Sequence, residues 1–472
     1  MWCVSVGCFR RGRAVGARFL RDRWFWLLLG CGLVVRLGLS AARPELLGED
    51  ADGYLAHAVE LAARGEFVGP FTGVRTAFRP PGYVCLLAVG LWLGLSPSAT
   101  VLAVHLMFTN ICVAATAGLA TIAGLSRVRV LIAVSCVVFD PLLVRYSVQP
   151  MSEVPCAALL VLGVLLFARA MSSSIGTAER AGWVAWGLVS RRELAAFFSG
   201  LLFAAGSLIR PAVLPAAVLC LGAFAVTRWG GDVTCLRERW DRRSEVAVGG
   251  GWFGVPRFRG ALLACAFGLV LGLMPWVWRN AVVFGAFIPA TTHGGYTLAL
   301  GNNPDFYRDV IHQPAGSMKN GYPWRGEALV GWQRRTLDEA AAAGVALGDE
   351  VALDTWYYDY AWASMEADWG GFLQACGLRF VRFWAFAGAG AGGLEFWLPG
   401  VWYGCLWLGL VPALLRLLTG RVAPVEICVW LSVAAFCGLH LCYWTDARMR
   451  APLMPLLAVL GAMCPALSFR RG

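Results

Sequence analysis

Three carboxylates lie within four consecutive residues of the first polar segment, those of Glu49, Asp50 and Asp52. A carboxylate placed just past an apolar run can act as a general base or bind a cation. On a helix, Asp50, Tyr54 and His57 would share one face through their three- and four-residue spacing. The structural alternative is a solvated acidic cap, which suits the N-terminus of an interfacial helix. Asp50 is therefore a candidate for proton transfer, and Asp52 and Tyr54 are candidate substrate contacts.

A fourth acid, Glu153, directly follows Ser152 at the start of a long apolar stretch. Ionisable groups beside membrane helices are costly and tend to be functional. The alternative is a helix cap, with Ser152 at the N-cap and Glu153 in the first turn. The functional interpretation gains weight if Glu153 faces Asp50.

Five arginines at the ends of apolar runs are candidates to hold a phosphate: Arg79, Arg210, Arg279, Arg448 and Arg450. A guanidinium group beside a stiff turn can bind a phosphate through two parallel hydrogen bonds. Arg79 precedes Pro-Pro-Gly and Tyr83, which adds an aromatic contact for a substrate. The alternative for each arginine is that it anchors a turn or extends to the membrane interface.

Two Gly- and Asn-containing stretches follow the apolar run that ends near 279. They contain His293 before Gly-Gly-Tyr, and Asn302 and Asn303 between Gly and Pro. Such residues suit turns. They also suit close approach to a sugar, since an amide both donates and accepts hydrogen bonds. His293, Asn302 and Asn303 are therefore candidate substrate-binding residues, with turn formation as the alternative.

The composition requires membrane helices to position these residues. Of 472 residues, 58% are hydrophobic and 15% charged, and the mean hydropathy is +0.64. A soluble fold cannot bury that much apolar surface, and a disordered chain is far more polar, so both classes are excluded. The net charge of +11 comes from arginines clustered between apolar runs. That pattern fits positive-inside topology better than nucleic-acid binding, and we expect no nucleic-acid partner.

The sixteen cysteines are read as small buried hydrophobes, because most lie inside apolar runs and none forms a Cys-x-x-Cys pair. The sequence also has no evident internal repeat. Transporters often contain such repeats, so their absence counts against that class.

Ten apolar runs are expected to form spans: 24–41, 99–124, 129–147, 153–169, 194–209, 211–228, 260–279, 397–418, 425–443 and 451–468. The first is expected to be a retained span rather than a cleaved signal peptide, since it is long and contains Arg36. The arginine-rich segments 169–192 and 228–259 should be cytoplasmic, which puts 42–98, 148–152, 280–396 and 444–450 outside. This parity requires 82–96 and 372–393 to be interfacial or re-entrant. The outside placement of Arg448 and Arg450 runs against the usual bias, which makes them the strongest phosphate candidates.

Three units are expected along the chain. Residues 1–279 would form an N-terminal transmembrane catalytic module that includes the first outer loop, 42–98. Residues 280–396 would form an extracytoplasmic loop segment with an interfacial helix. Residues 397–472 would form C-terminal transmembrane hairpins.

In their order along the chain, the motifs resemble those of the C-type (GT-C) superfamily of membrane glycosyltransferases. The resemblance is to its dolichyl-phosphate-mannose–protein mannosyltransferase-like and aminoarabinose-transferase-like group. The matching motifs are Asp50-Ala51-Asp52-Gly53-Tyr54, Arg79-Pro80-Pro81-Gly82-Tyr83, Ser152-Glu153, Arg210-Pro211, Pro-Trp-x-x-Arg-Asn at 275–280, Gly-Asn-Asn-Pro at 301–304 and Arg-x-Arg-x-Pro at 448–452. They cover most of the chain.

The resemblance implies an all-α polytopic membrane protein with about ten (roughly 8–13) transmembrane helices, interfacial helices in the first outer loop and a mixed extracytoplasmic loop segment. It further implies a multi-pass protein of the bacterial inner (plasma) membrane with its active site on the extracytoplasmic side. The implied donor is a polyprenyl-phosphate sugar, and the reaction is inverting transfer of a hexose or pentose to an acceptor hydroxyl or amine. Protein, glycolipid and polysaccharide all remain open as acceptors, and the presence of a divalent cation also remains open.

The resemblance also implies roles for single residues. Asp50 matches the catalytic base, but the acidic pair is Glu49-Asp50 where many mannosyltransferases have Asp-Glu, so Glu49 and Asp52 remain rivals. Glu153 matches the second carboxylate. Arg448 and Arg450 would hold the donor phosphate, with Arg79, Arg210 and Arg279 as lesser candidates. The implied substrate contacts are Asp52, Tyr54, Tyr83, His293, Asn302 and Asn303.

Two other classes remain open. A transporter or lipid-linked-sugar flippase would need a path of ionisable groups across the membrane. A non-catalytic scaffold would tolerate Asp50→Asn. The transferase interpretation fails if Asp50 and Arg448 lie at opposite membrane faces.

Overall fold

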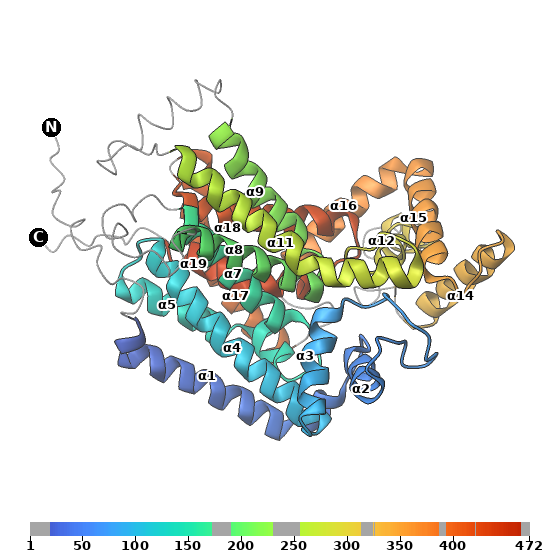
Figure 1. Cartoon of the computed structure of the whole chain (residues 1–472), viewed down its shortest axis with the longest axis horizontal. Helices are drawn as coiled ribbons and strands as arrows, with labels where there is room; N and C mark the ends of the chain where they lie inside the picture. Colours follow the sequence, from blue (N-terminus) through green and yellow to red (C-terminus); the bar gives the residue numbers. More distant parts are fainter. Residues whose placement is uncertain are drawn as a thin grey trace, which may run out of the picture.

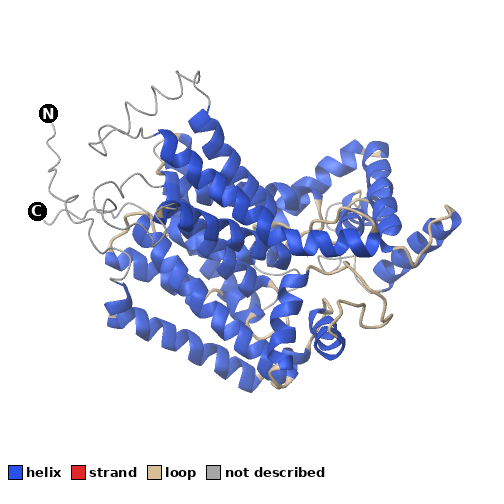
Figure 2. Ribbon diagram, viewed as in Figure 1, coloured by secondary structure: helices blue, strands red, loops and turns tan. Residues whose placement is uncertain are grey.

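The computed structural model describes residues 19–171, 190–229, 255–312, 324, 326–386, 393–420 and 422–463. Outside these residues lie residues 1–18, most of the predicted cytoplasmic segments 169–192 and 228–259, and the end of the last predicted span. The described chain forms a helical bundle with further helices at one end (Figure 1). Within it the regular structure is helical (Figure 2), apart from one isolated β-bridge between Val68 and Arg75.

Seven described helices are long and apolar enough to cross a membrane. A helix of 19 residues is about 29 Å long, close to the thickness of the hydrocarbon core. The seven are α1 (Arg23–Ala42), α4 (Pro97–Ile122), α7 (Glu153–Met171), α8 (Arg191–Ile209), α11 (Val255–Phe284), α17 (Leu394–Leu418) and α18 (Pro424–Cys442). The polytopic all-helical prediction is confirmed, whereas a count of about ten spans is not.

The remaining three predicted spans are shorter in the structure. The run 129–147 is split into α5 (Arg127–Val138) and α6 (Pro141–Tyr146). Pro141 suits the first turn of a new helix, and the Asp140 carboxylate caps α6 by accepting a hydrogen bond from Leu143 N at 2.9 Å. The run 211–228 forms α9 (Val213–Trp229), and the run 451–468 begins inside a 3₁₀ helix, η6 (Ala447–Leu453), followed by α19 (Met454–Gly461).

Two other apolar stretches were expected not to cross the membrane fully. The first forms α3 (Pro81–Trp92), whose 12 residues extend about 18 Å and are too short to cross. The second, 372–393, overlaps α16 (Trp369–Phe383), and its residues 387–392 lie outside the described chain. Helix α16 leaves several large apolar side chains exposed: Trp369, Leu373, Phe380 and Val381. Both helices have the lengths expected of interfacial or re-entrant elements.

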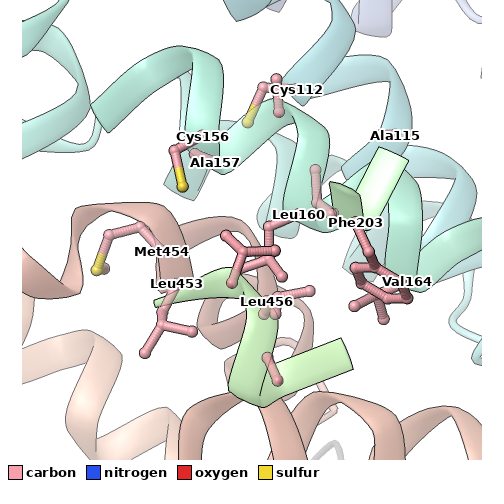
Figure 3. Packing of buried hydrophobic residues seen from close by; sticks show 14 of the residues in the cluster. Cys112, Ala115, Cys156, Ala157, Leu160, Val164, Phe203, Leu453, Met454 and Leu456 are labelled. Atoms are coloured by element: carbon pink, nitrogen blue, oxygen red, sulfur yellow. The ribbon is translucent and has the colours of Figure 1, made fainter. Parts of the chain in front are cut away.

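The core of the bundle surrounds α7. In an apolar 18-residue stretch of this helix, 78% of the residues are buried, the largest share among the seven helices. Figure 3 shows Cys156, Ala157, Leu160 and Val164 of α7 among side chains of α4, α8 and the η6–α19 segment. Helices α8 and α11 meet backbone to backbone, since a Cβ on Gly200 would lie 2.0 Å from the Cys265 carbonyl oxygen. Small residues permit this close approach between membrane helices.

The described part of the second loop segment is helical and has a core of its own. It contains α12 (Gly294–Gly301), α13 (Pro304–Phe306), a π-helical turn η5 (Tyr307–Ile311), α14 (Glu327–Ala342), α15 (Glu350–Ala367) and α16. Buried aromatic and apolar residues hold it together: Phe306, Tyr307, Trp324, Trp332, Tyr357 and Met365. These helices and α2 (Tyr54–Arg64) of the first loop lie at the same end of the bundle (Figure 1). Both loops can therefore contribute to one site.

Candidate functional site

Two acids and three arginines from distant parts of the chain meet at this end of the bundle. The acids are Asp52, before α2, and Glu153, the first residue of α7. The arginines are Arg79, before α3, Arg210, after α8, and Arg448, in η6. We call these five residues the charge cluster.

Each acid of the charge cluster contacts two of its arginines. Glu153 Oε1 lies 2.9 Å from Arg210 Nη1 and 3.4 Å from Arg448 Nε. Asp52 Oδ2 accepts a hydrogen bond from Arg448 Nη1 at 3.0 Å, and its Oδ1 lies 4.0 Å from Arg79 Nη2. Arg448 therefore bridges the two acids.

Local sequence explains how two of these arginines are placed. Helix α8 ends at Arg210, since Pro211 pushes the residue before it out of the helical region, and Arg210 adopts an extended conformation. Asp446 caps η6 by accepting a hydrogen bond from Arg448 N at 2.8 Å. That short helix places the Arg448 side chain beside the acids.

The three carboxylates of the first loop have different partners. Glu49 accepts a hydrogen bond from Gln149 Nε2 at 2.9 Å, and Asp52 is held by arginines. Asp50 Oδ2 accepts from Ala56 N at 2.9 Å, in the first turn of α2. Among these three acids, as the described residues surround them, Asp50 alone keeps a buried oxygen, Oδ1, without a hydrogen-bond partner.

The expectation that Asp50, Tyr54 and His57 share a helical face is wrong, because α2 begins only at Tyr54. Gly53 precedes it in a left-handed conformation (φ 74°) that favours glycine. His57 instead bonds the Val68 carbonyl through Nδ1 at 3.0 Å and stacks on Phe67.

The electrostatic surroundings of Asp52 and Arg448 shift the pKa of the acid down and that of the arginine up. Burial acts to raise the pKa of Asp52, but the charges of Arg448, Arg79 and Arg210 outweigh it and leave that pKa below its usual value. Burial likewise acts to lower the pKa of Arg448, and Glu153 and Asp52 outweigh it, so that pKa is raised. Asp52 is consequently a weak base.

The aromatic rings of Tyr54 and Tyr83 lie beside the charge cluster. Their rings meet edge to face at 5.3 Å, and the Arg79 guanidinium lies 5.6 Å from the Tyr54 ring centroid. The Tyr83 hydroxyl lies 2.7 Å from Nε2 of the buried His105. Burial, Glu153 and Asp50 all raise the pKa of Tyr83, so it stays protonated.

Glu153 Oε2 is buried and has no hydrogen-bond partner among the described residues.

Arg450, expected beside Arg448, points away from the charge cluster. It is fully buried, donates to the Phe383 carbonyl at 2.6 Å and lies 4.5 Å from the Tyr403 ring centroid. Residues two apart on a 3₁₀ helix are rotated by about 240°, so neighbouring arginines diverge. Arg450 holds η6 against α16 and α17.

We predict that Arg450→Met lowers the stability of the fold. The substitution keeps the apolar stem and removes the hydrogen-bond donor to the Phe383 carbonyl, which should cost about 1–3 kcal/mol. Thermal unfolding of the purified variant in detergent measures that loss. An unfolding temperature equal to that of the wild type would contradict this structural role of Arg450.

Arg279 anchors the first loop. It donates to the carbonyl oxygens of Thr76 at 2.9 Å and Phe67 at 3.0 Å, and it lies 5.0 Å from the Trp276 ring centroid. None of these contacts involves a member of the charge cluster.

Asn302 and Asn303 are buried, and their side chains bond the protein itself. Asn302 donates to the carbonyls of Leu298 and Cys442 and accepts from Arg379. Asn303 caps α13 by accepting from Phe306 N at 2.8 Å. The turn-forming alternative describes both asparagines, and neither meets the charge cluster.

His293 lies between Phe78 and Tyr296, with ring centroids at 4.2 and 4.9 Å. Burial, reinforced by the charge of Arg79, lowers its pKa to about 3, so it is neutral at physiological pH. Its Nδ1 is buried without a partner among the described residues. It lies between the two loop segments rather than in the charge cluster.

We predict that His293 makes the fold less stable in acid. Its pKa is lower in the folded state than in the unfolded chain, so the unfolded state binds the extra proton. Stability therefore falls as pH drops from about 6.5 toward 3, by about 2 kcal/mol at pH 5. Thermal unfolding at pH 7.5 and pH 5.0 measures it, and His293→Gln should show a smaller difference. An unchanged difference in that variant would contradict the assignment.

Sequence reasoning missed Gln149, His105 and Asp140. Gln149 binds Glu49, His105 binds Tyr83, and the buried Asp140 accepts from the Tyr403 hydroxyl at 3.3 Å. A polar residue inside an apolar run was the available signal for the last two.

The described residues contain no group of three or more His, Cys, Asp or Glu side chains that could hold a metal ion by themselves. Asp52 and Glu153 are instead neutralised by arginines.

No family model matches this sequence, and no curated protein matches it. Among solved structures, the fold matches oligosaccharyltransferases of Archaeoglobus fulgidus. The AglB structure, in complex with an inhibitory peptide and a dolichol-phosphate, has a TM-score of 0.51 and 13% identity, covering 94% of this chain and 50% of that one. A structure tethered to an acceptor peptide containing the NVT sequon has a TM-score of 0.53, 14% identity and the same coverage. A third, in complex with Zn and sulfate, has a TM-score of 0.51 and 15% identity, covering 93% and 48%.

This chain spans about half the length of the solved structures it matches. The fold expected from the sequence is confirmed, since this chain is similar in fold to these oligosaccharyltransferase structures. At this level of identity the likeness establishes the fold.

Proposed function

We propose that this protein is a membrane glycosyltransferase that moves a hexose or pentose from a polyprenyl-phosphate donor to an acceptor hydroxyl or amine, with inversion at the anomeric carbon. The proposal is carried by the charge cluster together with Asp50, which precedes Asp52 by two residues. The Oδ1 atom of Asp50 is buried without a hydrogen-bond partner among the described residues. The oligosaccharyltransferase structures bound to dolichol-phosphate and to an acceptor peptide support a lipid-linked donor.

Asp50 is the proposed general base. The acceptor oxygen or nitrogen attacks the anomeric carbon while its proton passes to Asp50 Oδ1, and the bond between that carbon and the phosphate oxygen breaks. The electron pair of that bond leaves with the phosphate. The transition state resembles an oxocarbenium ion, as in glycosidases. A phosphate leaving group needs no general acid.

The arginines of the charge cluster are the proposed phosphate site. Fixed guanidinium groups stabilise negative charge as it develops on the leaving oxygen. Glu153 orients Arg210 and Arg448, and Asp52 orients Arg448 and Arg79. Tyr54 and Tyr83 would line the sugar side.

We further propose a location and a division of labour. The site would face the extracytoplasmic side of a bacterial inner membrane, with membrane lipid around the bundle. Residues 280–396 would shape the acceptor side, residues 1–279 would supply the acids, and residues 397–472 would complete the phosphate site through Arg448. No observation favours the transporter alternative, since the groups proposed for catalysis gather at one end.

The test is transfer from a panel of radiolabelled polyprenyl-phosphate sugars by the purified protein in nanodiscs, with a mixed cell-envelope extract as acceptor. We expect one donor to label an acceptor and release polyprenyl phosphate. A folded protein that transfers from no donor would overturn the proposal in favour of a transporter or a scaffold.

A further inference from the structure

The segment 76–78 of the first loop is held by the second loop segment through contacts that the proposed chemistry does not use. Every backbone amide and carbonyl of this segment is hydrogen-bonded. Thr76 N donates to Phe67 O, and Phe78 N donates to the Thr76 hydroxyl. The other four groups bond residues beyond the first loop: Thr76 O to Arg279, Ala77 N to Glu350, Ala77 O to Thr292 N and Phe78 O to the Thr291 hydroxyl.

Glu350 makes two of the contacts to this segment. Its Oε2 accepts from the Thr76 hydroxyl and its Oε1 from Ala77 N, both at 2.6 Å. Hydrogen bonds to an ionised carboxylate are about twice as strong as neutral ones. Glu350 is also the first residue of α15, where the helix dipole favours a negative charge. The segment is therefore fixed to the start of α15.

Arg79 follows this segment directly. Pro80 and Pro81 come next, and their fixed φ angles leave the chain little freedom on that side. Arg79 is thus held from both directions in the position where it lies 4.0 Å from Asp52 and 5.6 Å from the Tyr54 ring centroid.

We propose that Glu350 is a positioning residue for Arg79, acting through segment 76–78 and assisted by Arg279. Glu350 touches neither Asp52 nor any other member of the charge cluster in the contacts described above. It connects the loop segment proposed to shape the acceptor side with an arginine proposed to hold the donor phosphate. The inference rests on the proposed function for the role of Arg79.

Hydrogen exchange of the protein in nanodiscs tests the contact without any activity. Glu350→Gln keeps the size of the side chain but removes its charge and replaces one of the two acceptor oxygens with an NH2 group, so the charge-assisted hydrogen bonds to segment 76–78 are weakened. Exchange in peptides covering 66–79 should be about tenfold faster. The matched control is Glu327→Gln, an exposed acid that is likewise the first residue of a helix, α14, and its exchange should equal that of the wild type. Unchanged exchange in Glu350→Gln would overturn the proposal.

A double-mutant cycle tests whether Glu350 acts through Arg79. Glu350→Gln should lower kcat/KM for the donor about tenfold in the wild-type background, with little change in acceptor KM, and should have no further effect in an Arg79→Ala background. Equal effects in both backgrounds would overturn the positioning role. A wild type without transfer would instead contradict the proposed function, and the exchange measurement would still decide whether Glu350 holds the segment.

Discussion

Asp50→Asn should lower the rate of sugar transfer by about 10²–10⁴-fold, the range that a positioned general base contributes. The amide oxygen can still accept the hydrogen bond from Ala56 N, so the start of α2 should remain intact. An amide cannot take the proton of the acceptor. Single-turnover transfer by the purified variant measures the rate, with thermal unfolding as a check on folding.

The matched control for Asp50→Asn is Glu49→Gln. It removes the same charge one residue away, and Glu49 is already bonded to Gln149. We expect transfer by this variant to remain within a few-fold of the wild type. If Asp50→Asn retains full activity while Asp52→Asn or Glu153→Gln loses it, the assignment of the base is wrong.

Arg448→Met should have the second largest effect, because Arg448 alone contacts both Asp52 and Glu153. We expect kcat/KM for the donor to fall by about 10²–10³-fold, the usual cost of losing one group that stabilises a developing anion. The loss should appear in kcat as well as in donor KM, since charge on the leaving phosphate grows in the transition state.

Arg448→Lys tests whether charge or geometry matters. Lysine restores the positive charge, but it lacks the planar guanidinium group that can hydrogen-bond two carboxylates at once. We therefore expect partial recovery of transfer. The exposed Arg145 on α6 offers a control, because Arg145→Met removes the same charge from a residue outside the charge cluster. A folded Arg448→Met variant with wild-type kinetics would contradict the proposed phosphate site.

Composition was sufficient to predict a polytopic helical membrane protein, since that class depends on total apolar content. The boundaries depended on more local features. Between Arg129 and Arg145 the run 129–147 is apolar except at Ser135 and Asp140, and hydropathy averaged over a window does not register a break there. The side-chain cap at Asp140 and the position of Pro141 end one helix and begin another.

The charge cluster could be predicted only as a set of candidates. Asp52 and Arg448 are 396 residues apart in the chain, and no local pattern pairs them. The order of the motifs along the chain, which resembles that of a known superfamily, was the one signal that assigned both residues to the same site. Arg448 and Arg450 looked equivalent in sequence because their divergence depends on the 3₁₀ geometry of η6.

Local hydrogen bonds decided the cases that the sequence left open. Glu49, Asp50 and Asp52 carry the same carboxylate group, so the sequence does not distinguish their roles. In the structure, their hydrogen-bond partners distinguish Asp50 from Glu49 and Asp52. For Asn302 and Asn303, the turn-forming role and the sugar-binding role use the same amide groups. Burial and bonding to the backbone favour the turn.

The measurement that tests the central claim most directly is the anomeric configuration of the transferred sugar. The product of the reaction with a polyprenyl-phosphate sugar of known anomer would be examined by NMR, with released polyprenyl phosphate quantified in the same sample. A single displacement with Asp50 as base predicts an inverted anomer and one polyprenyl phosphate released per sugar transferred. A retained anomer would contradict this account, because retention requires two displacements, the first of which links the sugar covalently to a nucleophile of the protein.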